Sequence, residues 1–352
     1  MNVKPLFKLM VEKKASDLFF APFAPAKIKI DGKIMPVNKL EMTPKMVKQA
    51  AIELMDDDLL ETFNRELEVD FAISEPGLGR FRVNVFHQRG NVAMVLRYIL
   101  SELPTLDELG MPEQLKELVM LRRGLVLMVG ATGSGKSTTL AAMINHRNEK
   151  TSSHIITIED PIEFLHPNKQ SIVNQREVGL DTKSYARALK SAMRGAPDVL
   201  QIGEVRDRES MQSAIDMAGT GHLVLGTLHA NNAPETLDRI INMYPPGQHA
   251  QVFMDLGHYL RAILSQRLVR ARTGKQIAAV ELMLNTPHIK DLILKGDVSA
   301  VKEALKDSGE RGMQSFDDAL LALYNAGTIT LEEAMTHADS RSNLEAKVNF
   351  GS

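Results

Sequence analysis

One stretch constrains the fold of this chain more than any other, the run LVLMVGATGSGKSTTL at residues 125–140. It opens with five consecutive apolar residues, which is typical of a strand buried on both faces. The run breaks at Gly130, and a helical pattern resumes at about Lys136. Between them stands the spacing Gly-x-x-x-x-Gly-Lys-Ser, the phosphate-binding loop, in the strand-to-helix context that this motif requires. The chain is therefore predicted to bind a nucleoside triphosphate.

Each residue type in this loop has a physical task. The glycines let the backbone curl so that successive N–H groups point at phosphate oxygens, and the N-terminus of the following helix adds partial positive charge. Lys136 can reach the outer phosphates, and the hydroxyl of Ser137 is suited to ligate Mg²⁺. The predicted nucleotide-binding residues are Gly130, Thr132, Gly133, Ser134, Gly135, Lys136, Ser137 and Thr138.

Composition excludes several classes of protein. The chain has 352 residues, 44% of them hydrophobic and 24% charged, which suits a globular protein of two domains. A net charge of −2 gives no bulk electrostatic reason to bind nucleic acid. The absence of cysteine excludes disulfides, thiol catalysis and cysteine-ligated zinc. No apolar run has the length of a signal peptide or a membrane span, so membrane association is expected only through a partner.

The sequence pattern changes near residue 100. Residues 1–100 hold a short helical pattern, a hairpin signal at Asp31-Gly32, a helix N-cap at Thr43 and alternating strands, which together predict a small α+β domain. Residues 101–110 are polar and predict a linker. From 111 to 352 helical stretches alternate with apolar strands, as in a parallel sheet covered by helices. The candidate strands are Leu125–Val129, Ile155–Ile158, Val199–Ile202 and Leu223–Thr227, and after about residue 234 we expect mainly helix, apart from a hairpin around Arg272–Lys275 leading into Ile277–Met283.

Polar residues follow two of these strands where catalytic groups are expected. The stretch IITIEDPIEF ends in Glu159, Asp160 and Glu163, three carboxylates at the carboxyl end of a strand, where open α/β sheets bind ligands. They could hold Mg²⁺ through water or polarise an attacking water; the alternative for an isolated trio is a solvated acidic loop. The stretch DVLQIGEVRD closes with Glu204, a Walker B-type arrangement, although Gln201 is unexpected in a buried run because a buried amide needs partners.

A third strand, in TGHLVLGTLHA, is bracketed by His222 and His229. Either imidazole could sense the γ-phosphate, although a lone histidine is more often structural. A further strand with catalytic-looking residues in the same sheet favours a functional role for His229.

The order GATGSGKST, IEDPIEF, GEVRD and TGHLVLGTLHA resembles the Walker A, Asp box, Walker B and His box of the secretion ATPase superfamily. Within it the chain resembles the type IV pilus retraction ATPases, the PilT/PilU family, including RFRVNVFHQRG early in the chain and GMQSFDDAL near its end. The resemblance implies an α/β fold, with a RecA-like P-loop NTPase core domain and a smaller N-terminal α+β, PAS-like domain.

The resemblance also implies site residues. Glu163 would be the catalytic carboxylate that orients or activates water, Glu204 would belong to Walker B and His229 would sense the γ-phosphate. The Mg²⁺ candidates are Ser137, Glu204 and Glu159. Arg82 and Arg97 match the arginines that close on nucleotide in this family, and the alternative for each is an exposed surface charge.

Absent and altered segments point to one branch of the family. Assembly and type II secretion ATPases typically carry a four-cysteine zinc element, and this chain has no cysteine. Pro287–Gly296 replaces the AIRNLIRE-like segment of the retraction motor proper, Gly219 stands where an acidic residue is usual, and the tail after Thr328 also differs. These departures favour a PilU-like accessory retraction ATPase.

The resemblance implies a cytoplasmic ATPase that uses ATP and Mg²⁺. The chain is expected to form a homo-hexamer and to act with a paralogous retraction ATPase and an inner-membrane pilus platform protein. It is expected neither to bind nucleic acid nor to insert directly into the membrane. The alternatives are a secretion or DNA-transfer motor, and a weakly hydrolysing ATP-binding subunit that regulates a paralogue.

Overall fold

The computed structural model describes residues 3–99, 102–306 and 312–350, and these form two compact units. One unit comprises residues 1–102 with Glu163–Leu165, and the other comprises 103–162 with 166–352. Two predictions from the sequence reach outside the described residues: a last strand of the first domain over Val92–Leu100, at Leu100, and the linker 101–110, at Ser101. No helix in the described part of the chain is long and apolar enough to cross a membrane.

The first unit is a six-stranded antiparallel sheet in the order β3-β2-β1-β6-β5-β4. Its core lies on one face, where Phe7 of α1 stacks on Phe81 of β5 at 4.5 Å between ring centroids. The Asp31-Gly32 turn and the N-cap at Thr43, whose side chain accepts a hydrogen bond from Met46 N, confirm those two sequence predictions. The elements are α1 (Lys4–Glu12), β1 (Asp17–Phe20), β2 (Pro25–Ile30), β3 (Lys33–Glu41), α2 (Pro44–Glu53), α3 (Asp57–Glu66), β4 (Glu68–Glu75), β5 (Gly79–Gln88) and β6 (Asn91–Ile99).

The second unit is a seven-stranded sheet in the order β13-β12-β7-β11-β10-β8-β9, in which β13 runs antiparallel to β12 and the other neighbours are parallel. The elements of its first half are α4 (Gln114–Val119), β7 (Gly124–Val129), α5 (Lys136–Lys150), β8 (His154–Glu159), β9 (Ile172–Glu177), α6 (Tyr185–Ala192), β10 (Val199–Ile202), α7 (Arg208–Gly219) and β11 (Leu223–Leu228). Those of its second half are α8 (Ala233–Asn242), the 3₁₀ turn Pro246–Gln248, α9 (His249–Tyr259), β12 (Leu260–Arg270), β13 (Gln276–Leu284), α10 (Pro287–Lys295), α11 (Val298–Lys306), α12 (Phe316–Asn325), α13 (Leu331–His337) and α14 (Arg341–Phe350).

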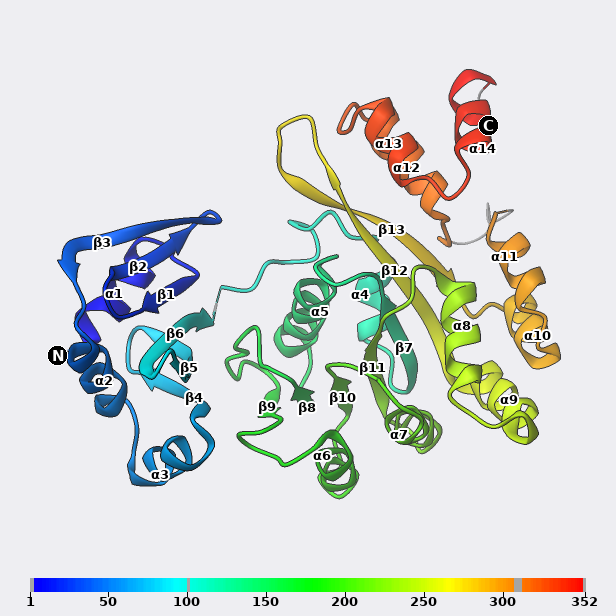
Figure 1. Ribbon diagram of the computed structural model, residues 1–352. Coiled ribbons are helices and arrows are strands. Elements are labelled where there is room, and N and C mark those ends of the chain that lie inside the picture. Colours follow the sequence, from blue (N-terminus) through cyan, green and yellow to red (C-terminus); the bar gives the residue numbers. More distant parts are fainter. Residues whose placement is uncertain (1–2, 100–101, 307–311, 351–352) are drawn as a thin grey trace. The chain divides into compact units, whose positions relative to one another are not determined.

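Helices cover both faces of this sheet, as the apolar strand runs predict (Figure 1). In β7, Leu125 and Leu127 face one core, with α6 to α9, whereas Val126 and Met128 face the other, with α4 and α5. An uninterrupted apolar strand is therefore required here, because either face would otherwise bury a polar group without a partner.

The chain after residue 234 contains more strand than the sequence indicated. The hairpin around Arg272–Lys275 is confirmed, but its first arm is an eleven-residue strand, β12, that pairs in parallel with β7 inside the main sheet. The polar residues Ser265, Gln266 and Arg267 obscured it, because their partners come from distant parts of the chain. Of the last three helices, α12 and α13 pack on the β12–β13 hairpin and α14 packs on these two helices, and together they form a small core that includes Val269.

Candidate nucleotide site

The phosphate loop lies at the carboxyl edge of the large sheet, between β7 and α5. Gly130, Gly133 and Gly135 have positive φ angles of 147°, 78° and 89°, which a residue with a side chain adopts only with strain. A Cβ at Gly130 would also lie 2.5 Å from the backbone oxygen of Gln266. Because Gly135 stands at the N-cap of α5 and offers no side-chain cap, the first N–H groups of that helix can serve an anion.

Lys136 is held at this loop. Its Nζ donates to the backbone oxygens of Gly130 and Ala131 at 2.7 and 2.8 Å. Its charge also reaches across the sheet edge, because it is among the groups that lower the pKa of Glu204. Lysine and Walker B carboxylate therefore belong to one electrostatic site.

Glu204 follows β10 and is the centre of a charged cluster. Its Oε1 lies 3.0 Å from Nε2 of His229, and its Oε2 accepts from Nε and Nη2 of Arg206 at 2.7 and 2.6 Å. Partial burial raises the pKa of Glu204, but the hydrogen bond from Arg206 and the charges of Arg206, His229 and Lys136 together hold that pKa below its usual value. The carboxylate is thus ionised at neutral pH.

Glu204 and His229 meet because β10 and β11 are parallel neighbours. Each residue stands just past the carboxyl end of its strand, so neither could contact the other in a different strand order. Thr227, near the end of β11, donates its hydroxyl hydrogen bond to the backbone oxygen of Gly203 and so links β11 to the turn that carries Glu204.

The other histidine of the third motif lies elsewhere. His222 precedes β11, at the amino end of the strand, and its Nδ1 lies 3.1 Å from the backbone oxygen of Met217. The possibility that His222 senses the γ-phosphate is therefore wrong, since it stands at the opposite edge of the sheet from the phosphate loop.

The three carboxylates at and after the end of β8 lie in different environments. Glu159 is buried, and its Oε1 accepts from the Thr157 hydroxyl at 2.6 Å and from Gln175 Nε2 at 3.1 Å. Asp160 joins the cluster of Glu204, with Oδ2 at 3.9 Å from Nη1 of Arg206. Glu163 is exposed and belongs to the compact unit of residues 1–102. The roles of Glu159 and Glu163 stay predictions.

Arg82 and Arg97 lie side by side in the first unit, as direct partners across β5 and β6. Arg82 Nε lies 3.6 Å from Oδ1 of Asp70, and Arg97 Nε donates to Oδ1 of Asp17 at 2.8 Å. Both alternate with core residues such as Phe81 and point away from the core face. Their part in closing on nucleotide also stays a prediction.

Two unusual residues of the sequence have a structural context. Gln201 is buried in β10, and its Oε1 has no hydrogen-bond partner among the described residues. Gly219 ends α7 under the ring of Tyr259, where a Cβ would lie 3.1 Å from Cζ, so the tyrosine fills the space that a side chain at 219 would need.

Sequence reasoning missed Gln266 and Arg206. The hydroxyl of Thr139 donates to Oε1 of Gln266 at 3.0 Å, and Nε2 of the same amide would lie 2.7 Å from a Cβ at Gly135. Gln266 of β12 thus contacts both the phosphate loop and the first turn of α5. No local sequence pattern indicates these contacts. Arg206 stands inside the GEVRD motif, so its charge beside Glu204 was the available signal.

Three comparisons relate the chain to known proteins. The family described as type II/IV secretion system protein matches residues 2–333. The type IV pilus ATPase PilU of Pseudomonas aeruginosa is 50% identical over 353 aligned positions, covering 100% of this chain and 92% of that protein. The type IV pilus retraction ATPase PilT of the same organism is 40% identical, over 98% of this chain and 100% of PilT. A crystal structure of the pilus retraction motor PilT with bound ADP matches with a TM-score of 0.91 and 41% identity, covering 98% of this chain and 99% of that chain.

Proposed function

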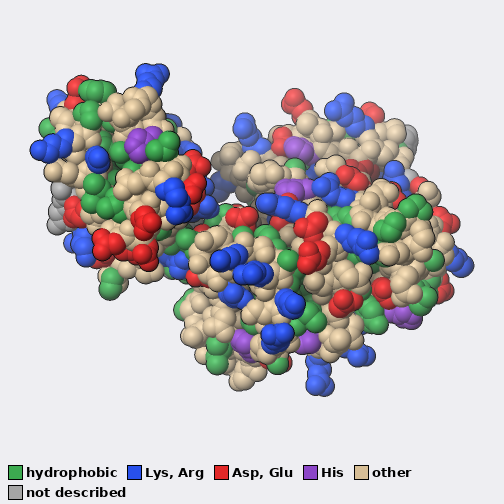
Figure 2. Space-filling view, turned by 60° about the horizontal axis from the view of Figure 1, so that its bottom comes forward, with side chains coloured by type: hydrophobic (Ala, Val, Ile, Leu, Met, Phe, Trp, Pro, Cys, Tyr) green, Lys and Arg blue, Asp and Glu red, His purple; other side chains and the backbone are tan. Residues whose placement is uncertain are grey.

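The chain belongs to the type II/IV secretion system protein family, and from this premise we propose that it is an ATP-hydrolysing motor of type IV pilus retraction in a PilU-like accessory role. One observation carries the proposal: Lys136, Glu204 and His229 share one electrostatic cluster in a chain that is similar to PilU along its whole length. Figure 2 shows basic side chains interspersed with acidic ones on the face in view, which agrees with the net charge of −2 and gives no support to a nucleic-acid cargo.

The residues at the phosphate loop suit Mg²⁺ and ATP. Ser137 stands in the first turn of α5, and its hydroxyl and the ionised carboxylate of Glu204 are oxygen donors of the kind that Mg²⁺ prefers. Mg²⁺ bound there supplies charge neutralisation at the β- and γ-phosphate oxygens. Glu159, with Oε1 already accepting two hydrogen bonds, is the third metal candidate.

We assign the chain's own residues the following tasks in hydrolysis. Lys136 holds the outer phosphates, and Glu163 orients or activates the attacking water. Nε2 of His229 lies 3.0 Å from Glu204, so the carboxylate orients the imidazole that senses the γ-phosphate. Arg82 and Arg97 complete the site by stabilising the charge that develops on the phosphoryl group.

We propose that the motor is a homo-hexamer that works with a paralogous retraction ATPase. It acts in the cytoplasm at the inner membrane through a pilus platform protein, and hydrolysis rotates one domain against the other about the segment 101–110, a hinge-type change. Light scattering or native mass measurement with nucleotide tests the ring, since a chain that stays monomeric with ATP contradicts it.

Steady-state ATPase assays of Lys136→Ala and Glu163→Gln test the chemistry. We expect each to lower kcat by about a hundredfold or more, because one removes phosphate charge compensation and the other removes the group that acts on water. Wild-type turnover in either variant overturns that residue's role. Loss of pilus retraction with secretion intact in a deletion strain separates this motor from a secretion motor.

A regulatory subunit is the second candidate, and the unpartnered Oε1 of Gln201 in the Walker B strand favours it. A regulatory chain has little ATPase activity alone and raises activity when mixed with its paralogue. Full activity of the purified chain alone excludes this candidate.

A further inference from the structure

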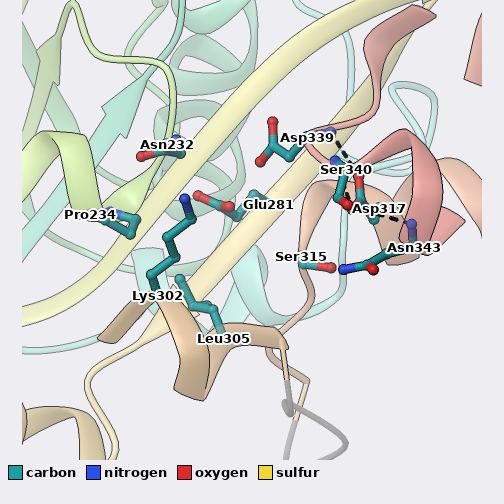
Figure 3. A pocket seen from close by; sticks show the side chains of 10 residues that line it. All are labelled: Asn232, Pro234, Glu281, Lys302, Leu305, Ser315, Asp317, Asp339, Ser340 and Asn343. Atoms are coloured by element: carbon teal, nitrogen blue, oxygen red, sulfur yellow. Dashed lines mark hydrogen bonds between the residues drawn. The ribbon is translucent and has the colours of Figure 1, made fainter. Parts of the chain in front are cut away.

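A cavity of about 460 Å³ lies in the second unit, away from the phosphate loop (Figure 3). It is enclosed by α8, β13, α11, α12 and α14, so its walls come from five elements of the chain. A second cavity of about 510 Å³ shares Asn232, Pro234 and Lys302 with the first and extends it along α8 and α11. Volumes of this size are typical of sites for small organic molecules. We call the two cavities together the acidic hollow.

Glu281 forms the buried end of the acidic hollow. Its side chain comes from β13 and the residue is only 4% exposed. The two hydrogen bonds that it accepts from described residues, from Ala233 N at 2.8 Å and from the Ser265 hydroxyl at 2.9 Å, both go to Oε1. Oε2 lines the cavity and accepts no hydrogen bond from a described residue, so it is available to a donor that enters the cavity. Burial raises the pKa of Glu281 to about 7.

The charges around Glu281 leave the acidic hollow negative. Asp339 also lines it, and one of its oxygens pairs with Arg267 at 2.7 Å. Both oxygens of Asp317 accept backbone N–H groups, at 2.8 and 3.2 Å. Lys302 is the basic residue of the lining, and its side chain extends toward Glu281 (Figure 3). Glu281 and Asp339 therefore each keep one oxygen that accepts no hydrogen bond from a described residue.

The second cavity repeats this chemistry at the other end. Asp238 of α8 and Asp297, just before α11, both line it and are exposed. Pro234 lines both cavities, and Leu305 lines the first. The acidic hollow thus has carboxylates in both cavities and one apolar residue, Pro234, shared by the two, a distribution that matches a methylene chain with an ammonium group at each end.

We propose that the acidic hollow binds a linear aliphatic polyamine, with one ammonium group at Glu281 and Asp339 and another at Asp238 and Asp297. An inorganic divalent cation fits less well. Among the residues that the structure describes, no three His, Cys, Asp or Glu side chains gather closely enough to hold a metal ion. The polyamine would give Oε2 of Glu281 the donor that it lacks and would keep its methylene groups against the apolar wall.

Isothermal titration calorimetry of the full chain with spermidine and with putrescine, at low salt and about pH 8, tests the proposal. We expect saturable binding of spermidine, and weaker binding of putrescine because it is shorter and carries fewer ammonium groups. Glu281→Gln keeps an acceptor oxygen for Ser265 and Ala233, and we expect it to weaken spermidine binding about tenfold. Lys302→Ala removes the competing cation, and we expect it to tighten binding about threefold.

Asp291→Asn is the matched control, because it removes the same charge from an exposed site on α10 that does not line the acidic hollow. We expect it to leave the affinity unchanged. Asp238→Asn, on the surface of α8, keeps the test valid if Glu281→Gln does not fold, and we expect it to weaken spermidine more than putrescine. No binding at about 10 mM spermidine, or equal affinity in Asp238→Asn, Asp291→Asn and the original chain, overturns the proposal.

Discussion

The phosphate loop and the acidic hollow lie on opposite faces of one strand, β12, and they are built in different ways. The phosphate loop is contiguous in sequence, and its partners follow β10 and β11 at the same sheet edge. The acidic hollow is lined by residues that are spread over the sequence from Asn232 to Asn343. They come from separate elements and form no sequence motif. One site can therefore be identified from spacing alone, whereas the other exists only once the chain has folded.

Three consecutive residues of β12 show how the two regions are joined. Ser265 donates to Glu281, and Arg267 pairs with Asp339, so both face the acidic hollow. Gln266, between them, braces the phosphate loop from the other face. This alternation is the period of a strand, and it means that neither site can shift along β12 without moving the other.

The largest effect is expected at the contiguous site. Glu204→Gln removes the charge that pairs with Arg206 and orients His229, and we expect kcat for ATP hydrolysis to fall about a hundredfold to a thousandfold. Glu209→Gln, exposed on α7, removes an equal charge nearby and serves as the control. A fall in kcat of less than about threefold in Glu204→Gln would contradict the proposal that the residues of the local motif catalyse ATP hydrolysis.

The next effect is on stability and belongs to the acidic hollow. The pKa of Glu281 is about 7 in the folded chain, against an ordinary value of 4.5, because burial and the charge of Asp339 outweigh its two hydrogen bonds and Arg267. An acid whose folded pKa is raised favours folding most below the unfolded pKa, and this contribution is lost as pH rises through the folded pKa. We therefore expect stability to fall by about 3 kcal/mol between about pH 4.5 and about pH 7.5 on account of this group.

Urea unfolding of the original chain and of Glu281→Gln over this pH range isolates that contribution. The difference between the two free energies of unfolding should shift in favour of the variant by about 3 kcal/mol as pH rises. A pH-independent difference would show that Glu281 is already ionised in the folded chain at acidic pH, and the contrast between Glu204, whose pKa is lowered, and Glu281, whose pKa is raised, would disappear.

The same contrast explains what the sequence could predict. The glycines of the phosphate loop, the apolar run of β7 and Glu204 each express a local requirement, so pattern and spacing located them. His222 and His229 look alike locally, and only strand direction separates them. Likewise, β12 was hidden because its polar residues find partners that are far away in the sequence. Strand direction decides which of the two histidines lies at the edge of the phosphate loop, whereas long-range pairing, which single-sequence patterns do not encode, accounts for the missed β12.

A smaller effect is expected where β12 touches the phosphate loop. Gln266→Ala removes the acceptor of the Thr139 hydroxyl and the amide beside Gly135, so the loop loses its brace. We expect KM for ATP to rise about tenfold with kcat little changed, because the charged cluster around Glu204, to which we assign the catalytic role, stays intact. Gln276→Ala, exposed at the start of β13, is the control. Equal falls in kcat and kcat/KM with KM unchanged would instead mean that Gln266 acts only in the transition state.

The smallest effect concerns a pair that, like the acidic hollow, forms only on folding. A Cβ at Gly219 would lie 3.1 and 3.2 Å from two atoms of the Tyr259 ring, and an acidic residue at the end of α7 would also oppose the helix dipole. We expect Gly219→Asp to cost about 1 kcal/mol of unfolding free energy, measured by urea titration. In a Tyr259→Ala background the steric part of this cost should vanish, which leaves only the dipole part. If Gly219→Asp lowered the unfolding free energy equally in both backgrounds, the Tyr259 ring would not be the reason that glycine stands at position 219.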